Sequence, residues 1–185
     1  SFAMMRTSAM GSAAGAGREF IGGYSFTAWQ KKLSEDAAMM DSFLNDAEMF
    51  REILVNKNRL TVSITGEETL PELEKLIKAL PVNDFQPGVV RYPLLEKRNE
   101  GIAVPANVSF AAKSSLIDDK VKKIGTMIVL TNILTYDYLW NNIRVKGGAY
   151  GTGFRSGIVK TAGFYSYRDP NPANSLNVYK KTVEY

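Results

Sequence analysis

Arg144 and Tyr150 flank a pair of glycines, and the chemistry of their side chains suits one shared target, a peptide carbonyl group. An Arg guanidinium donates a fork of hydrogen bonds to a carbonyl or carboxylate oxygen. A Tyr hydroxyl can bond the same carbonyl and stabilise an oxyanion that forms on it. We expect Arg144 near the C-terminal end of a helix, Gly147 and Gly148 at its stop, and Tyr150 at the start of the next strand. Both side chains could therefore point into the same cleft.

The same residues also have a purely structural interpretation. The helix dipole favours an Arg near a helix C-terminus, a Gly-Gly pair is a common helix stop, and a Tyr in a strand usually packs against its neighbours. Taken one at a time, these residues favour the structural interpretation over a binding site.

Composition excludes several kinds of site. The 185 residues contain no histidine and no cysteine, so we predict no metal ligands, no cofactor and no catalytic residue in this chain. The net charge is +4, and the basic residues are scattered among acidic ones. Because they form no continuous basic stripe, we predict that the chain does not bind nucleic acid. No apolar run approaches the roughly 20 residues of a membrane span. A chain without cysteine suits a reducing compartment, and we expect a cytoplasmic location, with an organellar matrix as the alternative.

Helical spacing dominates the first 80 residues. The small residues at 10–17 are typical of a mobile or helix-leading segment, and apolar residues then recur every three or four positions. Alternation of apolar residues and threonine or serine predicts one strand. The expected elements are a helix from Ser25 to about Ser42, a helix from Asp46 to Val55 capped by Asn45, a strand at 60–65, and a helix opened by the capping box Thr69-Leu70-Pro71-Glu72.

Prolines, glycines and charges between Pro81 and Pro105 indicate a connection, and a second set of elements follows it. We therefore divide the chain into residues 1–85, a linker at 86–103, and residues 104–185. The expected elements of the last part are a strand Val108–Ala112, a long helix from about Lys120 to Asn142, a hairpin of strands Ala149–Phe154 and Ala162–Tyr167 turning near Ser156-Gly157, and a final helix capped by Asp169-Pro170 or Asn174. This order favours an α+β fold.

The string from Ile143 to Gly151, followed by Tyr165-Ser166-Tyr167-Arg168-Asp169-Pro170-Asn171, is more specific than any of its residues alone. It resembles the insulinase-like (pitrilysin) zinc metallopeptidases, and within them the presequence-protease branch, at the start of the fourth and last domain. Two weaker matches, Arg18-Glu19-x-x-Gly22 and the stretch from Asn58 to Ser63, look like the end of the third domain.

The resemblance implies an antiparallel sheet with helices on one face, as in mitochondrial processing peptidase-like metallohydrolase domains. It also implies that Arg144, Tyr150, Gly147 and Gly148 bind peptide substrates inside a closed chamber. Zinc and the general base would come from the N-terminal catalytic half of the parent protein, so this chain alone would be inactive. The alternative is an inactive scaffold or partner subunit of the same superfamily.

The chain ends within a predicted helix, where a full fourth domain of this family would continue. We therefore interpret the sequence as a fragment. Strands without their partners leave open edges that can pair with another chain. The fragment is expected to self-associate.

Overall fold

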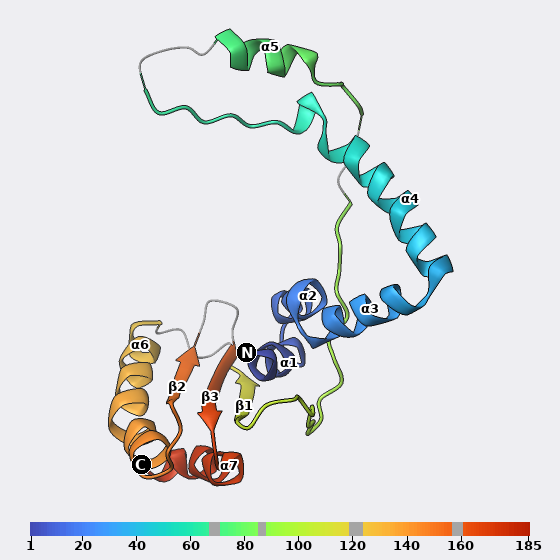
Figure 1. Ribbon diagram of the computed structural model, residues 1–185. Coiled ribbons are helices and arrows are strands. Elements are labelled where there is room, and N and C mark those ends of the chain that lie inside the picture. Colours follow the sequence, from blue (N-terminus) through green and yellow to red (C-terminus); the bar gives the residue numbers. More distant parts are fainter. Residues whose placement is uncertain (67–70, 85–87, 119–123, 157–160) are drawn as a thin grey trace. The chain divides into compact units, whose positions relative to one another are not determined.

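The structure is a computed structural model, and it describes residues 1–66, 71–84, 88–118, 124–156 and 161–185. Contacts divide the chain into two compact units, one formed by residues 1–28 with 91–185 and the other by residues 29–90. Figure 1 shows the helices and strands of both units. The linker at 86–103, inferred from prolines, glycines and charges, stays a prediction.

Helices and strands follow one another in the order that an α+β fold requires, confirming the predicted fold class. In chain order they are α1 (Phe2–Ala9), α2 (Ala13–Gly22), α3 (Tyr24–Glu35), α4 (Ala37–Leu54), the 3-10 turn η1 (Lys57–Arg59), α5 (Pro71–Ala79), β1 (Ser109–Leu116), α6 (Ile124–Ile133), the π-helix η2 (Leu134–Val145), β2 (Gly151–Ser156), β3 (Thr161–Asp169), α7 (Pro172–Lys181) and the 3-10 turn η3 (Thr182–Glu184). None of the helices within the described ranges is long and apolar enough to cross a membrane.

The first unit is built on a three-stranded antiparallel sheet in the order β1-β3-β2 (Figure 1). Strands β2 and β3 form the predicted hairpin, with Gly151 opposite Tyr167 and Ser156 opposite Ala162. Strand β1 pairs with the other edge of β3, and its register shifts between Ser109 and Ala111. The sheet therefore joins segments that lie about 50 residues apart in the chain.

One face of this sheet holds the hydrophobic core. Leu139 and Ile143 of η2 are fully buried against it, and burial of each side chain stabilises the fold by about 2 kcal/mol. Phe154 and Phe164 lie opposite each other on the same face, and the ring of Phe164 stacks on Tyr179 of α7 at 5.2 Å between centroids. Helices η2 and α7 thus cover this face, as predicted.

The other face of the sheet is contacted at one end by the N-terminal helices. Leu116 and Thr161 are paired, and their alternation places them opposite the core face. Both side chains lie beside Gly11, directly after α1. Helix α1 therefore reaches the face that η2 and α7 leave open.

Small residues in the N-terminal segment pack two helices together. The segment at 10–17 was predicted to be mobile or to lead a helix, and most of it forms α2, whose N-cap Ser12 accepts a hydrogen bond from Gly15 N–H at 3.0 Å. A Cβ on Gly15 would lie 2.3 Å from the carbonyl oxygen of Ser8, so only glycine permits this approach of α2 to α1.

A network of charged side chains ties the segment after residue 90 to α1 and α2. Arg6 donates two hydrogen bonds to Glu100, at 2.8 and 2.7 Å, and one to the fully buried Glu19 at 3.0 Å. Leu95 N–H donates to the carbonyl of Ala9 at 3.0 Å. Part of the predicted linker is therefore held against the first unit.

The second unit corrects two predictions. The helix predicted from Ser25 to Ser42 is interrupted at Asp36, whose carboxylate accepts a bond from Met39 N–H at 3.1 Å and caps α4. Asn45, predicted as a cap, lies in the middle of α4, because Asp36 provides the earlier N-terminus.

The strand predicted at 60–65 is wrong. Leu60, Val62 and Ile64 lie in an extended segment that pairs with no strand in the described parts of the chain, and all three are exposed. Alternation marks a strand only where a neighbouring strand supplies hydrogen bonds. Helix α5 is confirmed, whereas Thr69 and Leu70 of its capping box lie outside the described residues.

The predicted long helix from Lys120 to Asn142 is present as α6 and η2, and its first residues lie outside the described ranges. It extends three residues further than predicted, to Val145. The final helix α7 is confirmed, but its cap is Asn171, whose side chain accepts a bond from Asn174 N–H at 3.2 Å, rather than Asp169 or Asn174.

Candidate functional site

The predicted site lies where η2 ends and the chain turns into β2. Ala149 N–H donates to the carbonyl of Ile143 at 3.1 Å and Gly148 N–H to that of Arg144 at 3.0 Å. Gly148 has φ +78°, in the left-handed region that favours glycine. A Cβ on Gly147 would lie 2.6 Å from the carbonyl oxygen of Ile143. Both glycines are therefore required by the turn itself.

This turn is anchored on the end of β3. Tyr150 N–H donates to the carbonyl of Arg168 at 3.3 Å, and Gly148 lies beside the ring of Pro170. The anchor holds Tyr150 at the edge of the sheet, one residue before β2 begins.

Arg144 lies on the surface of η2, half-buried, with its guanidinium carbon 3.9 Å from the ring centroid of Trp140. In a π-helix each N–H bonds the carbonyl five residues earlier, so side chains four residues apart lie almost directly above one another. Trp140 and Arg144 have this spacing. An Arg stacked on Trp gains about 1 kcal/mol from the ring. No ion pair with a described carboxylate involves Arg144. Its N–H groups are thus presented by a stacked, ordered side chain.

Tyr150 is two-thirds exposed, and its ring packs edge-on against Tyr167 at 5.8 Å between centroids. Tyr167 packs edge-on against Phe110 of β1 at 5.1 Å. The guanidinium carbon of Arg168 lies 5.9 Å from the ring of Tyr150 and 5.6 Å from that of Tyr167. Tyr150 is therefore a member of an aromatic and cationic cluster at the end of the sheet.

Arg144 and Tyr150 occupy the two ends of one turn, but their side chains have different neighbours. Arg144 rests on Trp140, and Tyr150 rests on Tyr167 and Arg168. That both face one cleft stays a prediction.

Sequence reasoning missed Tyr167 as a neighbour of Tyr150, although a signal was present. Tyr165 and Tyr167 are two positions apart in a strand, so they share a face, and the core already occupied the other face. Arg168 and Asp169 are adjacent in sequence, but their side chains have different neighbours. The structure separates them: Asp169 is buried, and its Oδ1 accepts a bond from Asn171 N–H at 2.8 Å.

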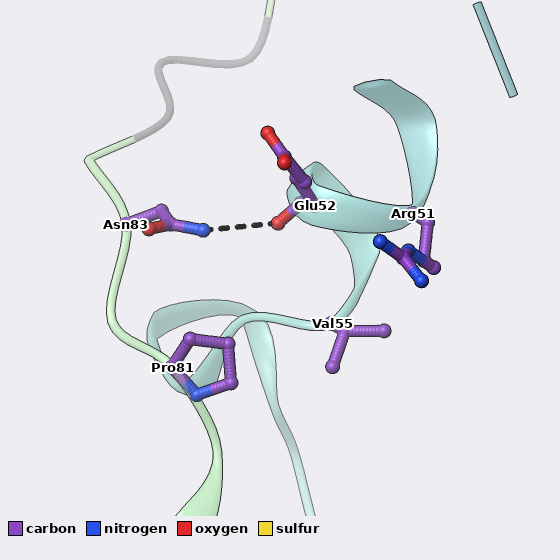
Figure 2. A pocket seen from close by; sticks show the side chains of 5 residues that line it. All are labelled: Arg51, Glu52, Val55, Pro81 and Asn83. Atoms are coloured by element: carbon purple, nitrogen blue, oxygen red, sulfur yellow. Dashed lines mark hydrogen bonds between the residues drawn. The ribbon is translucent and has the colours of Figure 1, made fainter. Parts of the chain in front are cut away.

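A pocket lies in the second unit, which contains none of the predicted site residues. Figure 2 shows its lining by Arg51, Glu52 and Val55 at the end of α4 and by Pro81 and Asn83. Asn83 donates to the carbonyl of Glu52 at 3.1 Å. The side-chain amide of Asn56 is buried and joins the same two segments. Its Nδ2 donates a hydrogen bond to the carbonyl of Asn83 at 2.7 Å. These hydrogen bonds join the two segments that line the pocket.

The residues that the structure describes contain no group of three or more carboxylates placed to hold a metal. With no histidine or cysteine in the whole chain, the residues present do not fit a zinc centre.

Comparison with known proteins matches residues 99–185 to the family model described as the PreP C-terminal domain. Presequence protease 1, chloroplastic/mitochondrial, of Arabidopsis thaliana is 31% identical over 99% of this chain and 18% of its own length. Protein HypA of Clostridium perfringens is 33% identical over 88% of this chain and 17% of its own length. The mitochondrial presequence protease of Saccharomyces cerevisiae is 26% identical over 98% of this chain and 22% of its own length.

The chain thus spans about a fifth of the length of the curated relatives it matches. The organellar names belong to eukaryotic relatives, and the cytoplasmic location predicted from composition gains no support from them. The match to a C-terminal domain model covers the turn, the hairpin and α7, which carry the predicted site. The resemblance drawn from the string around Arg144 and Tyr150 is confirmed, and the chain belongs to the presequence-protease branch of the insulinase-like family, as a C-terminal part.

Proposed function

We propose that this chain is the non-catalytic, peptide-binding C-terminal portion of a zinc metalloendopeptidase that resembles presequence proteases. The observation that carries the proposal is the turn at Gly147-Gly148. It presents an Arg held on an aromatic ring at one end and a largely exposed Tyr at the other. Within the described residues, the contacts of the Arg144 guanidinium and of the Tyr150 ring are with aromatic rings and Arg168, and neither the guanidinium nor the hydroxyl has a side-chain hydrogen-bond partner, so both retain their donors for a ligand.

The chemistry of these two groups fits a peptide in an extended conformation. Each backbone carbonyl of such a peptide is an acceptor, and an ordered donor loses little side-chain entropy when it bonds. Arg144 would position a carbonyl, and Tyr150 would donate to the oxygen on which negative charge develops. The two glycines would hold the donors at fixed places without contributing side chains.

Hydrolysis itself would be performed by residues outside this chain. Zinc, when bound by the N-terminal half of the parent protein, would supply the activated water. Residues of the present chain would bind and orient the peptide, and alone they would not cleave it. The names of the relatives are the basis for a proposed compartment. In a eukaryote, the parent protein would be located in a mitochondrion or chloroplast.

A titration of the 185-residue chain with an unstructured peptide tests binding directly. Trp140 is a built-in reporter, because Arg144 lies on its ring, and Trp29→Phe removes the other indole. We expect peptide to change Trp140 fluorescence, with the Kd raised about tenfold by Arg144→Ala and by a smaller factor in Tyr150→Phe. Tyr136→Phe is the matched control, since Tyr136 is exposed to the same degree on η2.

Turnover in the full-length parent protein completes the test. Tyr150→Phe should lower kcat/KM by roughly tenfold to a thousandfold with folding intact, because it removes a donor to the developing oxyanion. Full activity in a folded Arg144→Ala, Tyr150→Phe double variant would overturn the proposal and leave both residues with a structural role. A parent protein that binds peptide but never cleaves it would favour the scaffold alternative.

A further inference from the structure

Arg168 is the one residue other than glycine that has a positive φ, +47°, within the described parts of the chain. This region is unfavourable for a side chain with a Cβ, so it persists only where neighbouring contacts impose it. Its carbonyl accepts the N–H of Tyr150, and the next residue, Asp169, is buried. The hydrogen bond from Tyr150 and the burial of Asp169 therefore fix the backbone conformation of Arg168. The side chain of Arg168 starts from a backbone that these contacts hold in place.

That side chain lies on two aromatic rings. Its guanidinium carbon is 5.9 Å from the centroid of Tyr150 and 5.6 Å from that of Tyr167. Tyr167 is in turn braced edge-on by Phe110 of β1. Three segments that are distant in sequence thus combine to hold one cation at the end of the sheet.

The cluster carries a positive charge without a compensating carboxylate. Among the described residues, no ion pair involves Arg168, and the Oδ1 of the adjacent Asp169 accepts a hydrogen bond from Asn171 N–H. Arg144, at the other end of the Gly147-Gly148 turn, is also unpaired among described residues. A guanidinium that rests on rings still presents N–H groups, and two of them match the two oxygens of a carboxylate.

We propose that Arg168, held on Tyr150 and Tyr167, binds a carboxylate of the peptide and so sets a preference for negatively charged groups at one end of the site. This inference rests on the proposed peptide-binding function and adds a substrate class to it. The carboxylate comes either from the peptide C-terminus or from an Asp or Glu side chain, since both present the same pair of oxygens.

Four matched peptides separate these sources, measured by the Trp140 titration in the Trp29→Phe background. One pair differs only in a C-terminal acid or amide, and the other only in an internal Glu or Gln. The wild-type chain should bind one acidic member about tenfold more tightly than its neutral partner. Whichever pair shows the difference identifies the source.

Arg168→Gly is the decisive variant, because glycine accepts the positive φ and the chain keeps its fold. It should abolish the preference for the acidic peptide, so that the acidic peptide and its neutral partner bind the variant with Kd values within about twofold of each other. Arg155→Ala is the matched control, since Arg155 lies over Tyr165 at 4.9 Å on the same sheet, and it should keep the preference. Circular dichroism verifies that both variants fold.

The outcomes distinguish the two proposals. If peptides bind and Arg144→Ala weakens them, but Arg168→Gly retains the acid preference, the carboxylate site is refuted and the peptide-binding function stands. Equal loss of acidic and neutral peptides in Arg168→Gly would also refute it, because the residue would then serve only packing. If no peptide binds the folded wild-type chain, both proposals fail.

Discussion

Removing Arg6 should destabilise the first unit more than any change to its partner Glu100. Arg6 bonds Glu19, whose side chain is fully buried, and Glu19 Oε1 also accepts Ser25 N–H at 2.8 Å. Arg6→Met leaves the Glu19 carboxylate buried without its cation, which costs about 3–5 kcal/mol of unfolding free energy. Burial without a partner, rather than the loss of attraction, sets this magnitude.

Glu100→Gln is a milder change of the same network. It removes the charge that accepts two bonds from Arg6, at 2.8 and 2.7 Å, while Arg6 keeps Glu19. Charge-assisted bonds contribute about 1.5–3 kcal/mol, and the amide of Gln retains one acceptor, so we expect a loss of about 2 kcal/mol. Arg98→Gln, which removes a bond from a side chain that is 53% exposed, is the control and should cost less than about 1 kcal/mol.

The pKa of Glu100 gives the same network a signature in acid. Hydrogen bonds from Arg6, and then from Arg98, lower this pKa to about 2, against the opposing effect of burial. Because the folded-state pKa lies below the ordinary value near 4.5, the stabilisation is complete above about pH 4.5 and is lost as the pH falls toward 2. Each pKa unit corresponds to about 1.4 kcal/mol, and solvent around the partly exposed carboxylate reduces the total to about 2 kcal/mol.

Urea denaturation of the Trp29→Phe chain, followed by Trp140 fluorescence and circular dichroism at a series of pH values from about 7 to 2.5, checks these values. Trp140 belongs to the first unit, so its signal reports the unit that contains Arg6. Wild type should lose stability between pH 5 and 2.5 more steeply than Glu100→Gln. Parallel pH curves for the two, or a cost below about 1 kcal/mol for Arg6→Met, would refute the reasoning.

Three further predictions concern the turn, the core and the surface. Gly148→Ala should cost roughly 1 kcal/mol because of its positive φ, and Gly147→Ala should cost more because its Cβ meets the Ile143 carbonyl; equal thermal stability of all three proteins would contradict this. Burial raises the pKa of Tyr179, so wild-type stability should fall above about pH 10, where the unfolded Tyr ionises, whereas Tyr179→Phe should lack that decline in alkaline urea titrations. Its buried hydroxyl has no bond of good geometry, so the same variant should lose less than about 1 kcal/mol at pH 7. The 185-residue chain should self-associate through exposed apolar residues such as Ile128 and Val129 of α6, and light scattering across a dilution series that shows a compact monomer throughout would contradict this.

Short-range patterns made much of the first unit predictable. The hairpin followed from alternation on both sides of a turn, and the helix stop followed from Gly147-Gly148, since each depends on residues close in sequence. The string around Arg144 and Tyr150 identified the family before any fold was known, because its specificity lies in spacing rather than in contacts.

The remaining features depend on partners that lie far along the chain. The segment at 60–65 has strand-like alternation but no neighbouring described strand, and the π-helical form of η2 left no mark in the residue pattern. The sequence determined which residues carry donors and aromatic rings. Only the antiparallel register of β2 and β3, with Gly151 opposite Tyr167, decided that Tyr150 meets Tyr167 and Arg168. Cross-strand neighbours are set by hydrogen bonds between distant segments, and the order of residues in one strand does not specify them.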